Sequence, residues 1–504
     1  MPLTRTQRLT MNLNKVTTTN PLELIFFVAM VSVTGWLLMG PNYLLAPLPA
    51  VGILFFIALL YNPHFGYYII IFLIPFSTIM ETLGLAQYMT ISKLVGVWLV
   101  IYVTFRAFIE RSFPSNFSSR LWPLLSLFFI VNLIATFTSE FTALGFDNVR
   151  QLLSSYLFYG LTLIFITENG FYKTLPALIT ASISFNSILS FIGFLFVLSV
   201  LSSDTDILRA TGFSGDPNFF AALSLFGIPI VAHQIKVHKK ISMKIFFTCA
   251  LIIAICAVVL SFSRSSFRVL LIVLALLAFE YIPKVKAKQL GWIAVSVATS
   301  VVLALILIPS SYWERQQSLT DSSIDRRVTY LFVAWDTFKK HPLLGVGPGA
   351  FPEEYANSEY AHQFAEELFT DLNPTKKNKF TAEFRQKVSR QLSEHYDELY
   401  KRAAHNTYLE VVAGSGGLGL IVFLAILVTA MKSYLRAISL FRECDDEESA
   451  SQTKSYFLSM IAIMLAFMFL SSVYHKFFWL PIAMSQVALR LAEKKIELKN
   501  ANTN

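Results

Sequence analysis

The chain has 504 residues, of which 55% are hydrophobic, and it contains 46 phenylalanines. This apolar content exceeds what a soluble core needs, and it falls in runs of near spanning length, which excludes an ordinary soluble protein. The formal net charge is +9. Most of the excess lies in short loops between apolar runs, where Lys and Arg act as topology signals, so we expect no nucleic-acid partner.

The apolar runs follow one another along the chain and predict an all-α fold, a polytopic transmembrane helical bundle of about 12–14 spans. They lie near residues 22–39, 43–61, 65–81, 91–108, 121–138, 151–167, 175–201, 217–233, 244–262, 265–282, 290–309, 407–431, 455–473 and 476–491. Two breaks leave open whether the flanking runs are separate helices. They are Asn62-Pro63 and the stretch from Ser261 to Ser266.

A long polar segment divides the chain. We expect transmembrane helices 1–11 in residues 1–309, a helical cap in residues 310–405, and the last transmembrane helices with a cytoplasmic tail in residues 406–504. With the basic N-terminus in the cytoplasm, most loop Lys and Arg fall on the inner side and the long segment falls outside. In a bacterium this predicts a multi-pass protein of the inner membrane with its cap in the periplasm.

Three stretches of the polar segment have helical patterns. VTYLFVAWDTFKK carries Leu331, Ala334, Trp335 and Phe338 at helical spacing and should stop at His341-Pro342, because the residue before a proline tends to leave the helical region. PEEYANSEYAHQFAEELF opens with a proline and acidic residues, and TAEFRQKVSRQLSEHYDELYKR has an apolar stripe. We expect a small helical cap on the membrane surface.

Arginines near the outer boundary are the candidate functional residues, because charge at membrane depth is costly and usually serves a function. They are Arg209, Arg264, Arg268, Arg326 and Arg327. Arg326 and Arg327 have a second interpretation, as solvated residues paired with nearby aspartates. Asp and Glu are nearly absent from the spans, which disfavours a proton- or sodium-coupled transporter.

Arg209 precedes Asp216-Pro217, a pair suited to begin a helix. A helix N-terminus beside an arginine favours an anion pocket, and snorkelling to the interface is an equal alternative for Arg209. Arg264 and Arg268 are four residues apart, so their charges repel unless an anion lies between them. We expect Arg264 to be the functional one and Arg268 to lie deeper, beside lipid headgroups.

His405 is the candidate base. It opens HNTYLEVV at the mouth of a span, and neutral imidazole is suited to removing a proton from a hydroxyl, although a lone histidine is more often structural. His341 has the simpler interpretation of a helix cap. Cys249, Cys256 and Cys444 lie outside the polar segment, and no His/Cys/Asp/Glu cluster has metal-ligand spacing, so we expect neither disulfides nor a metal site.

Two glycine-rich strings do not fit nucleotide binding. GVGPGAF lacks the lysine of a P-loop, and GSGGLGL lies in an apolar span with no strand before it. A tight turn and close helix packing explain them better.

The order of four strings, RATGFSGDPNFFA, LSFSRSS, RRVTYLFVAWDTFKKHPLLGVGPGAF and HNTYLEVVAGSGGLGL, resembles the O-antigen ligase superfamily, which includes O-antigen and exopolysaccharide polymerases. The resemblance covers about Arg209 to Leu420. It implies a metal-independent glycosyltransferase without a cofactor, which takes a glycan from an undecaprenyl-diphosphate carrier at the periplasmic face. The acceptor it implies is lipid A-core for a ligase and a second carrier-linked glycan for a polymerase.

By this resemblance His405 is the base, Arg209 and Arg264 bind the diphosphate, and Arg326 or Arg327 is a third diphosphate ligand. The residue chemistry agrees, because arginine forks stabilise a departing diphosphate without an acid or a metal, and direct displacement inverts the anomeric centre. A long charged insertion between Phe351 and His405 and the number of spans depart from the simplest ligase pattern. A polymerase, a protein O-oligosaccharyltransferase and a membrane transporter therefore stay as alternatives.

Overall fold

The structure is a computed structural model that describes residues 57–76, 90–196, 202–203, 209–281, 322–361, 401–471 and 473–503. The chain forms two compact units, Met1–Gly66 and Tyr67–Asn504. The described residues are almost all helical, so the protein is an all-α polytopic protein, as predicted.

The described α-helices are α4 (Pro63–Phe72, which crosses the unit boundary), α6 (Ile91–Glu110), α7 (Trp122–Phe137), α8 (Thr142–Phe165), α9 (Leu175–Leu195), α10 (Pro217–Val237), α11 (Ile241–Leu260), α12 (Arg264–Tyr281), α15 (Ser322–Lys340), α16 (Phe351–Ala356), α20 (Thr407–Glu443), α21 (Glu447–Ala466) and α22 (Lys476–Thr503). Short elements are η2 (Ile74–Phe76), η3 (Ser115–Phe117), the π-helical turn η4 (Gly170–Thr174), η5 (Gly212–Ser214) and the antiparallel strands β1 (Ser202–Ser203) and β2 (Arg209–Ala210).

Five described helices are long and apolar enough to cross a membrane, and α7 is a shorter apolar helix. The five are α6, α9 with η4, α10, α11 and α20. The chain is therefore a multi-pass membrane protein. The expected spans near 22–39 and 290–309, and most of 43–61, lie outside the described residues, so the total of about 12–14 stays a prediction.

Both ambiguous breaks separate helices. Asn62 interrupts the helical backbone before α4. α11 ends at Leu260 and α12 begins at Arg264, and between them Phe262 has a left-handed φ of 51°.

Several helices extend beyond the apolar runs that predicted them. α8 begins at Thr142, where 151 was expected, and α20 continues to Glu443 where 431 was expected. The extra turns are amphipathic and carry surface ion pairs, such as Arg150 with Asp147 at 3.0 Å. Hydropathy detects only the apolar part of such helices.

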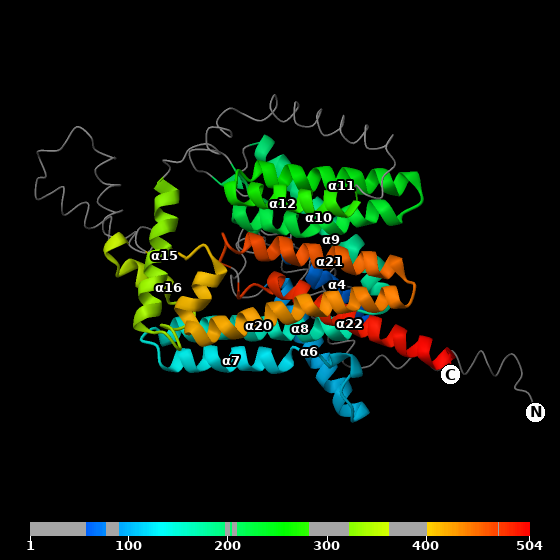
Figure 1. The fold of residues 1–504 in the computed structure, drawn as a ribbon, viewed down its shortest axis with the longest axis horizontal. Coiled ribbons are helices and arrows are strands. Elements are labelled where there is room, and N and C mark those ends of the chain that lie inside the picture. Colours follow the sequence, from blue (N-terminus) through cyan, green and yellow to red (C-terminus); the bar gives the residue numbers. More distant parts are fainter. Residues whose placement is uncertain are drawn as a thin grey trace, which may run out of the picture. The chain divides into compact units, whose positions relative to one another are not determined.

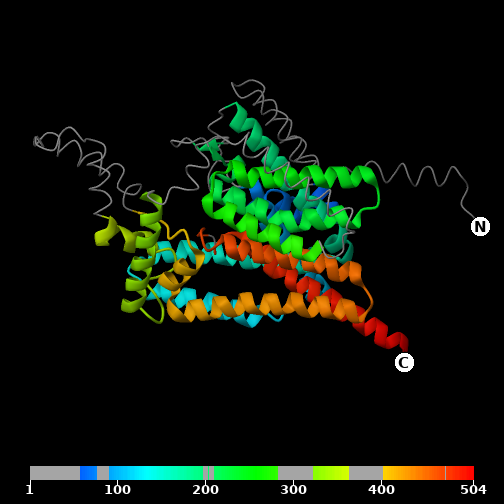
Figure 2. The ribbon, with the colours of Figure 1, turned by 45° about the horizontal axis from the view of Figure 1, so that its top comes forward.

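The bundle is built around α10, the most buried of the five spanning helices. α10 packs against α11 and α21, and α20 packs against α22 and α7. Figures 1 and 2 show α10, α11, α12, α20 and α21 running side by side. One end of the bundle, the distal end, holds polar contacts such as Lys236 Nζ to Ser451 Oγ at 3.0 Å and an ion pair between Arg120 and Glu493.

α15 runs across the opposite end of the bundle and packs against α20 (Figures 1 and 2). It ends at Lys340, before His341-Pro342, as predicted. Its buried face is formed by Tyr330, Val333 and Ala334, whereas Leu331 and Trp335 are exposed. The stripe expected from the sequence therefore supplies only Ala334 to the core. The third helical pattern of the polar segment lies outside the described residues.

Candidate functional site

The starts of α10 and α12 meet at the end of the bundle opposite the distal end. Asp216 caps α10, its Oδ1 accepting a hydrogen bond from Phe219 N at 2.8 Å, and Pro217 follows at the first turn, as predicted. Ser263 Oγ donates to Asn218 Oδ1 at 2.8 Å. This bond joins the two helix starts and fixes Arg264, the first residue of α12, beside α10.

Arg209 reaches the same place from β2. Its Nε donates to the carbonyl oxygen of Ser261 at 2.9 Å, at the end of α11 and three residues before Arg264. Ala210, the second residue of β2, and Thr211, which follows it, are both buried. The arginine is therefore held against the α11–α12 connection, with its Nε engaged by the backbone.

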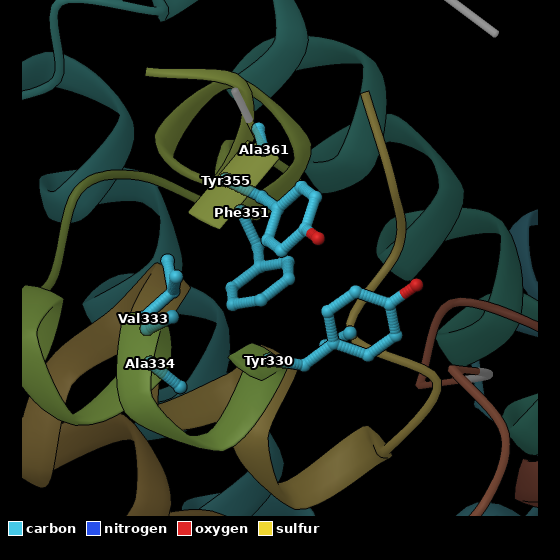
Figure 3. Packing of buried hydrophobic residues seen from close by; sticks show 8 residues of the cluster. Tyr330, Val333, Ala334, Phe351, Tyr355 and Ala361 are labelled. Carbon is cyan, nitrogen blue, oxygen red and sulfur yellow. The ribbon is translucent and has the colours of Figure 1, made fainter. Parts of the chain in front are cut away.

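α15 brings Arg327 to the site on a small aromatic core. Tyr330 meets Tyr355 with ring centroids 5.0 Å apart and Phe351 at 6.3 Å, both edge to face. Figure 3 shows these three rings together, with Val333 and Ala334 to their left on α15. Lys401 Nζ pairs with Glu353 Oε1 at 2.9 Å and ties the chain ahead of α20 to α16.

The two glycine-rich strings pack backbone to backbone and join α15 to α20. Val346 N donates to Ala413 O at 2.9 Å, and Gly417 N donates to Pro342 O at 2.8 Å. Gly416 interrupts α20 with φ 64° and ψ −166°, and a Cβ there would lie 2.3 Å from Leu343 C and O. These contacts confirm the interpretation of the strings as turns and close packing. We call this contact the glycine joint.

His405 sits in the turn that enters α20. Its φ is 45°, and the next residue, Asn406, caps α20 by accepting from Tyr408 N at 2.9 Å and Leu409 N at 3.1 Å. Thr407 Oγ1 donates to Leu470 O at 2.6 Å, which anchors the turn to the end of α21. The imidazole lies against Tyr330, with ring centroids 6.0 Å apart.

The charges of these elements act on one another. Burial lowers the pKa of His405, and the positive charges of Arg327 and Arg402 lower it further, whereas Asp216 raises it. An imidazole in this setting is neutral at physiological pH, as a proton acceptor must be.

Arg327 shares this electrostatic environment. Its side chain is exposed, yet desolvation by the surrounding protein lowers its pKa, and the charges of Arg264 and Arg268 add to that effect, while Tyr330 and Asp216 oppose it. Like charges held this close favour an anionic partner between them.

A second imidazole lies nearby in the α21–α22 connection. His475 packs on Phe219 with ring centroids 5.0 Å apart, and its pKa is lowered by burial and raised by Asp216. The charge of Asp216 thus acts on His405, Arg327 and His475, which come from three separate segments.

The structure brings Arg264, Arg327 and His405 together and holds Arg209 at the same end of the bundle, beside Ser261. Arg326 belongs to α15, and its side chain lies outside the described residues. Arg268 is exposed on α12, and its charge also acts on Arg327, a coupling that the sequence did not predict because four-residue spacing does not show which charges from distant segments are neighbours. The sequence interpretation also missed the second role of Asp216, interpreted only as a helix cap.

No group of three His, Cys, Asp or Glu side chains among the residues described could hold a metal ion. The site is therefore built from guanidinium groups, one carboxylate, imidazoles and helix N-termini.

Comparison with protein families identifies the segment that carries most of this site. The profile described as O-antigen ligase matches residues 249–424, from α11 to the middle of α20. This part of the chain is similar to the O-antigen ligase family. The matched segment contains Arg264, Arg327 and His405, and Arg209 precedes it. No curated protein matches the chain.

The match to the O-antigen ligase family confirms the resemblance and indicates a glycosyltransferase-like membrane enzyme, with a lipid-linked glycan and an acceptor as its general partners. It does not separate ligases from polymerases.

Proposed function

We propose that this protein is an O-antigen ligase that transfers a glycan from an undecaprenyl-diphosphate carrier to a hydroxyl of lipid A-core at the periplasmic face of the inner membrane. The observation that carries the proposal is the gathering of Arg264, Arg327 and His405 at one end of a membrane-spanning bundle, inside the family match. The diphosphate-binding roles of Arg209 and Arg326 are part of the same proposal.

The negative charge of the donor's leaving group explains why arginines gather at this site. When the bond between the anomeric carbon and the diphosphate oxygen breaks, its electron pair stays on the diphosphate. Arg264 and Arg327 stabilise this negative charge through charge-assisted hydrogen bonds. The repulsion between the two guanidinium charges falls once the diphosphate lies between them. The site is therefore pre-organised for an anion.

Helix N-termini add to this preference. α10, α12 and α20 all begin at this end of the bundle, and the aligned peptide dipoles give each start a partial positive charge. A diphosphate beside three helix starts gains from all of them. Side chains already accept several of the N–H groups, since Asp216 caps α10 at Phe219 and Asn406 caps α20 at Tyr408 and Leu409. The ligand therefore gains from the field of the helix dipoles.

His405 is the proposed base that activates the acceptor hydroxyl. The neutral imidazole takes the proton of the acceptor hydroxyl as its oxygen attacks the anomeric carbon on the face opposite the diphosphate. One glycosidic bond forms, one carbon–oxygen bond to the diphosphate breaks, and the anomeric centre inverts. The imidazolium that results is stabilised by Asp216, whose charge acts on His405. No step requires a metal or a cofactor.

Purified protein with a carrier-linked glycan and lipid A-core tests the proposal. We expect a new glycosidic bond of inverted configuration and release of undecaprenyl diphosphate, with Arg264→Ala reducing the rate at least about 100-fold. A transporter would give no product.

Deletion of the protein in its host separates ligase from polymerase. A ligase deletion accumulates full-length glycan on the carrier and leaves lipid A-core bare. Surface glycans reduced to single repeat units would instead assign the protein as a polymerase, and glycan missing only from proteins would assign it as a protein O-oligosaccharyltransferase.

A further inference from the structure

An apolar cavity of about 420 Å³ lies between α6, α7, α8 and η3, away from the site described above. Its wall includes Val103, Phe117, Trp122, Phe129 and Leu153. The volume falls in the range of small-molecule pockets, roughly 300–1,000 Å³. The wall is mostly hydrocarbon, so an apolar chain is the ligand class that suits it.

The cavity is at the lipid-facing side of the bundle. α6, which forms one wall, is the least buried of the five spanning helices. Its outward residues include Val97, Ile101 and Phe105, which are 60–62% exposed. In a membrane-spanning chain such side chains face lipid tails. Three residues that line the cavity, Ile130, Leu153 and Leu157, are themselves 45–50% exposed, so the cavity opens toward the lipid tails.

The cavity also has a polar boundary at the distal end, where α6 ends. Phe113, Phe117 and Trp122 surround this end of the cavity, an arrangement typical of the membrane interface. Arg106 pairs with Glu110 at 2.7 Å. Arg111, two residues before Phe113, is exposed and forms no ion pair with any other residue in the described ranges.

We propose that this cavity binds one acyl chain of an anionic phospholipid, whose phosphate lies at Arg111. The aromatic rings contact the part of the acyl chain nearest the headgroup, and the Arg111 guanidinium favours a headgroup with negative charge. This lipid site is independent of glycan transfer and uses none of the residues placed in the transfer site.

Native mass spectrometry of the full-length protein, purified in mild detergent and exposed to phosphatidylglycerol, tests the site. Ser126 lines the cavity from α7, so Ser126→Phe fills it and should abolish retention of one phospholipid. Leu127→Phe is the matched control, because Leu127 is the next residue on α7, is 45% exposed, and lies outside the cavity wall. It should retain the lipid like the unmodified protein.

A second variant tests the headgroup. Arg111→Gln should lower the preference for phosphatidylglycerol over phosphatidylethanolamine by about fivefold, the effect of one basic residue near a membrane surface. Three results would overturn the proposal: no phospholipid on the unmodified protein, retention by Ser126→Phe equal to that of Leu127→Phe, or an isoprenoid chain in place of the phospholipid. An unchanged headgroup preference in Arg111→Gln would overturn the role of Arg111.

Discussion

The carboxylate of Asp216 has two effects. Its Oδ1 caps α10, and its negative charge acts on His405, Arg327 and His475. A positively charged site of this kind would depress the basicity of any imidazole in it, and Asp216 opposes that effect. In the proposed mechanism, Asp216 keeps His405 basic enough to accept a proton while the arginines favour an anion.

Asp216→Asn should lower the pKa of His405, because asparagine keeps the helix cap and loses the charge. The groups that remain near His405, Arg327 and Arg402, both lower its pKa. The acidic limb of the pH profile for transfer should therefore move to lower pH, and the rate at neutral pH should fall about tenfold. Glu359→Gln, an exposed acid in the cap, is the control. A limb that stays in place or moves to higher pH would contradict this role.

The sequence predicted which residues form the site, but it did not predict which of them lie close together. The motif strings and the cost of charge near the membrane singled out Arg209, Arg264, Arg326, Arg327 and His405. The electrostatic coupling of Arg268 to Arg327 and the contact of Tyr330 with His405 depend on how distant segments pack. No spacing in the chain encodes those contacts.

At the scale of elements, the glycine joint sets the position of the turn that bears His405. α20 loses regular helical geometry at Gly416, and backbone hydrogen bonds to the segment after α15 cross that interruption. The outer part of α20 is thus held by the segment that also ends α15, the helix carrying Arg327. The joint links the proposed base to one of the proposed diphosphate ligands.

Gly416→Ala should break the joint. The backbone there adopts a conformation that is essentially restricted to glycine, and the added Cβ would meet the Leu343 backbone at 2.3 Å. We expect a loss of about 2 kcal/mol of stability, seen as a lower apparent Tm in detergent, together with loss of transfer.

Gly96→Ala is the matched control for Gly416→Ala, because its Cβ would have an ordinary contact at 3.8 Å with Ile70 Cδ1. It should leave both Tm and transfer close to those of the unmodified protein. An equal Tm for the two variants would show that the joint is not strained.

Helix ends were the least predictable part of the fold. Apolar runs located α6, α7, α10, α11 and α12 to within a few residues, since those helices are apolar along most of their length. α8, α20 and α22 extend into amphipathic turns that hydropathy alone does not detect. The sequence also suggested an unbroken helix at the start of α20, whereas Gly416 interrupts it at the glycine joint.

At the scale of the whole molecule, the two ends of the bundle differ in character. The distal end holds the Lys236, Arg120 and Lys495 contacts, and the opposite end holds the site. The positive-inside rule predicts that the distal end is cytoplasmic and the site end periplasmic.

Cysteine labelling checks this orientation. Asn357 is exposed in the cap, and the native Cys444 lies in the α20–α21 connection at the distal end. A membrane-impermeant maleimide should label Asn357→Cys in spheroplasts and should label Cys444 only after permeabilisation. The reverse pattern would place the site in the cytoplasm and remove its access to a periplasmic acceptor.

The most direct measurement is glycan transfer by purified His405→Ala beside purified His341→Ala, with the same carrier-linked donor and lipid A-core acceptor. His341 is an exposed histidine at the end of α15, outside the electrostatic cluster, and serves as the matched control. We expect His405→Ala to bind the donor and lose at least about 100-fold in transfer rate, while His341→Ala keeps its rate. Transfer by His405→Ala at the rate of the unmodified protein would contradict the account.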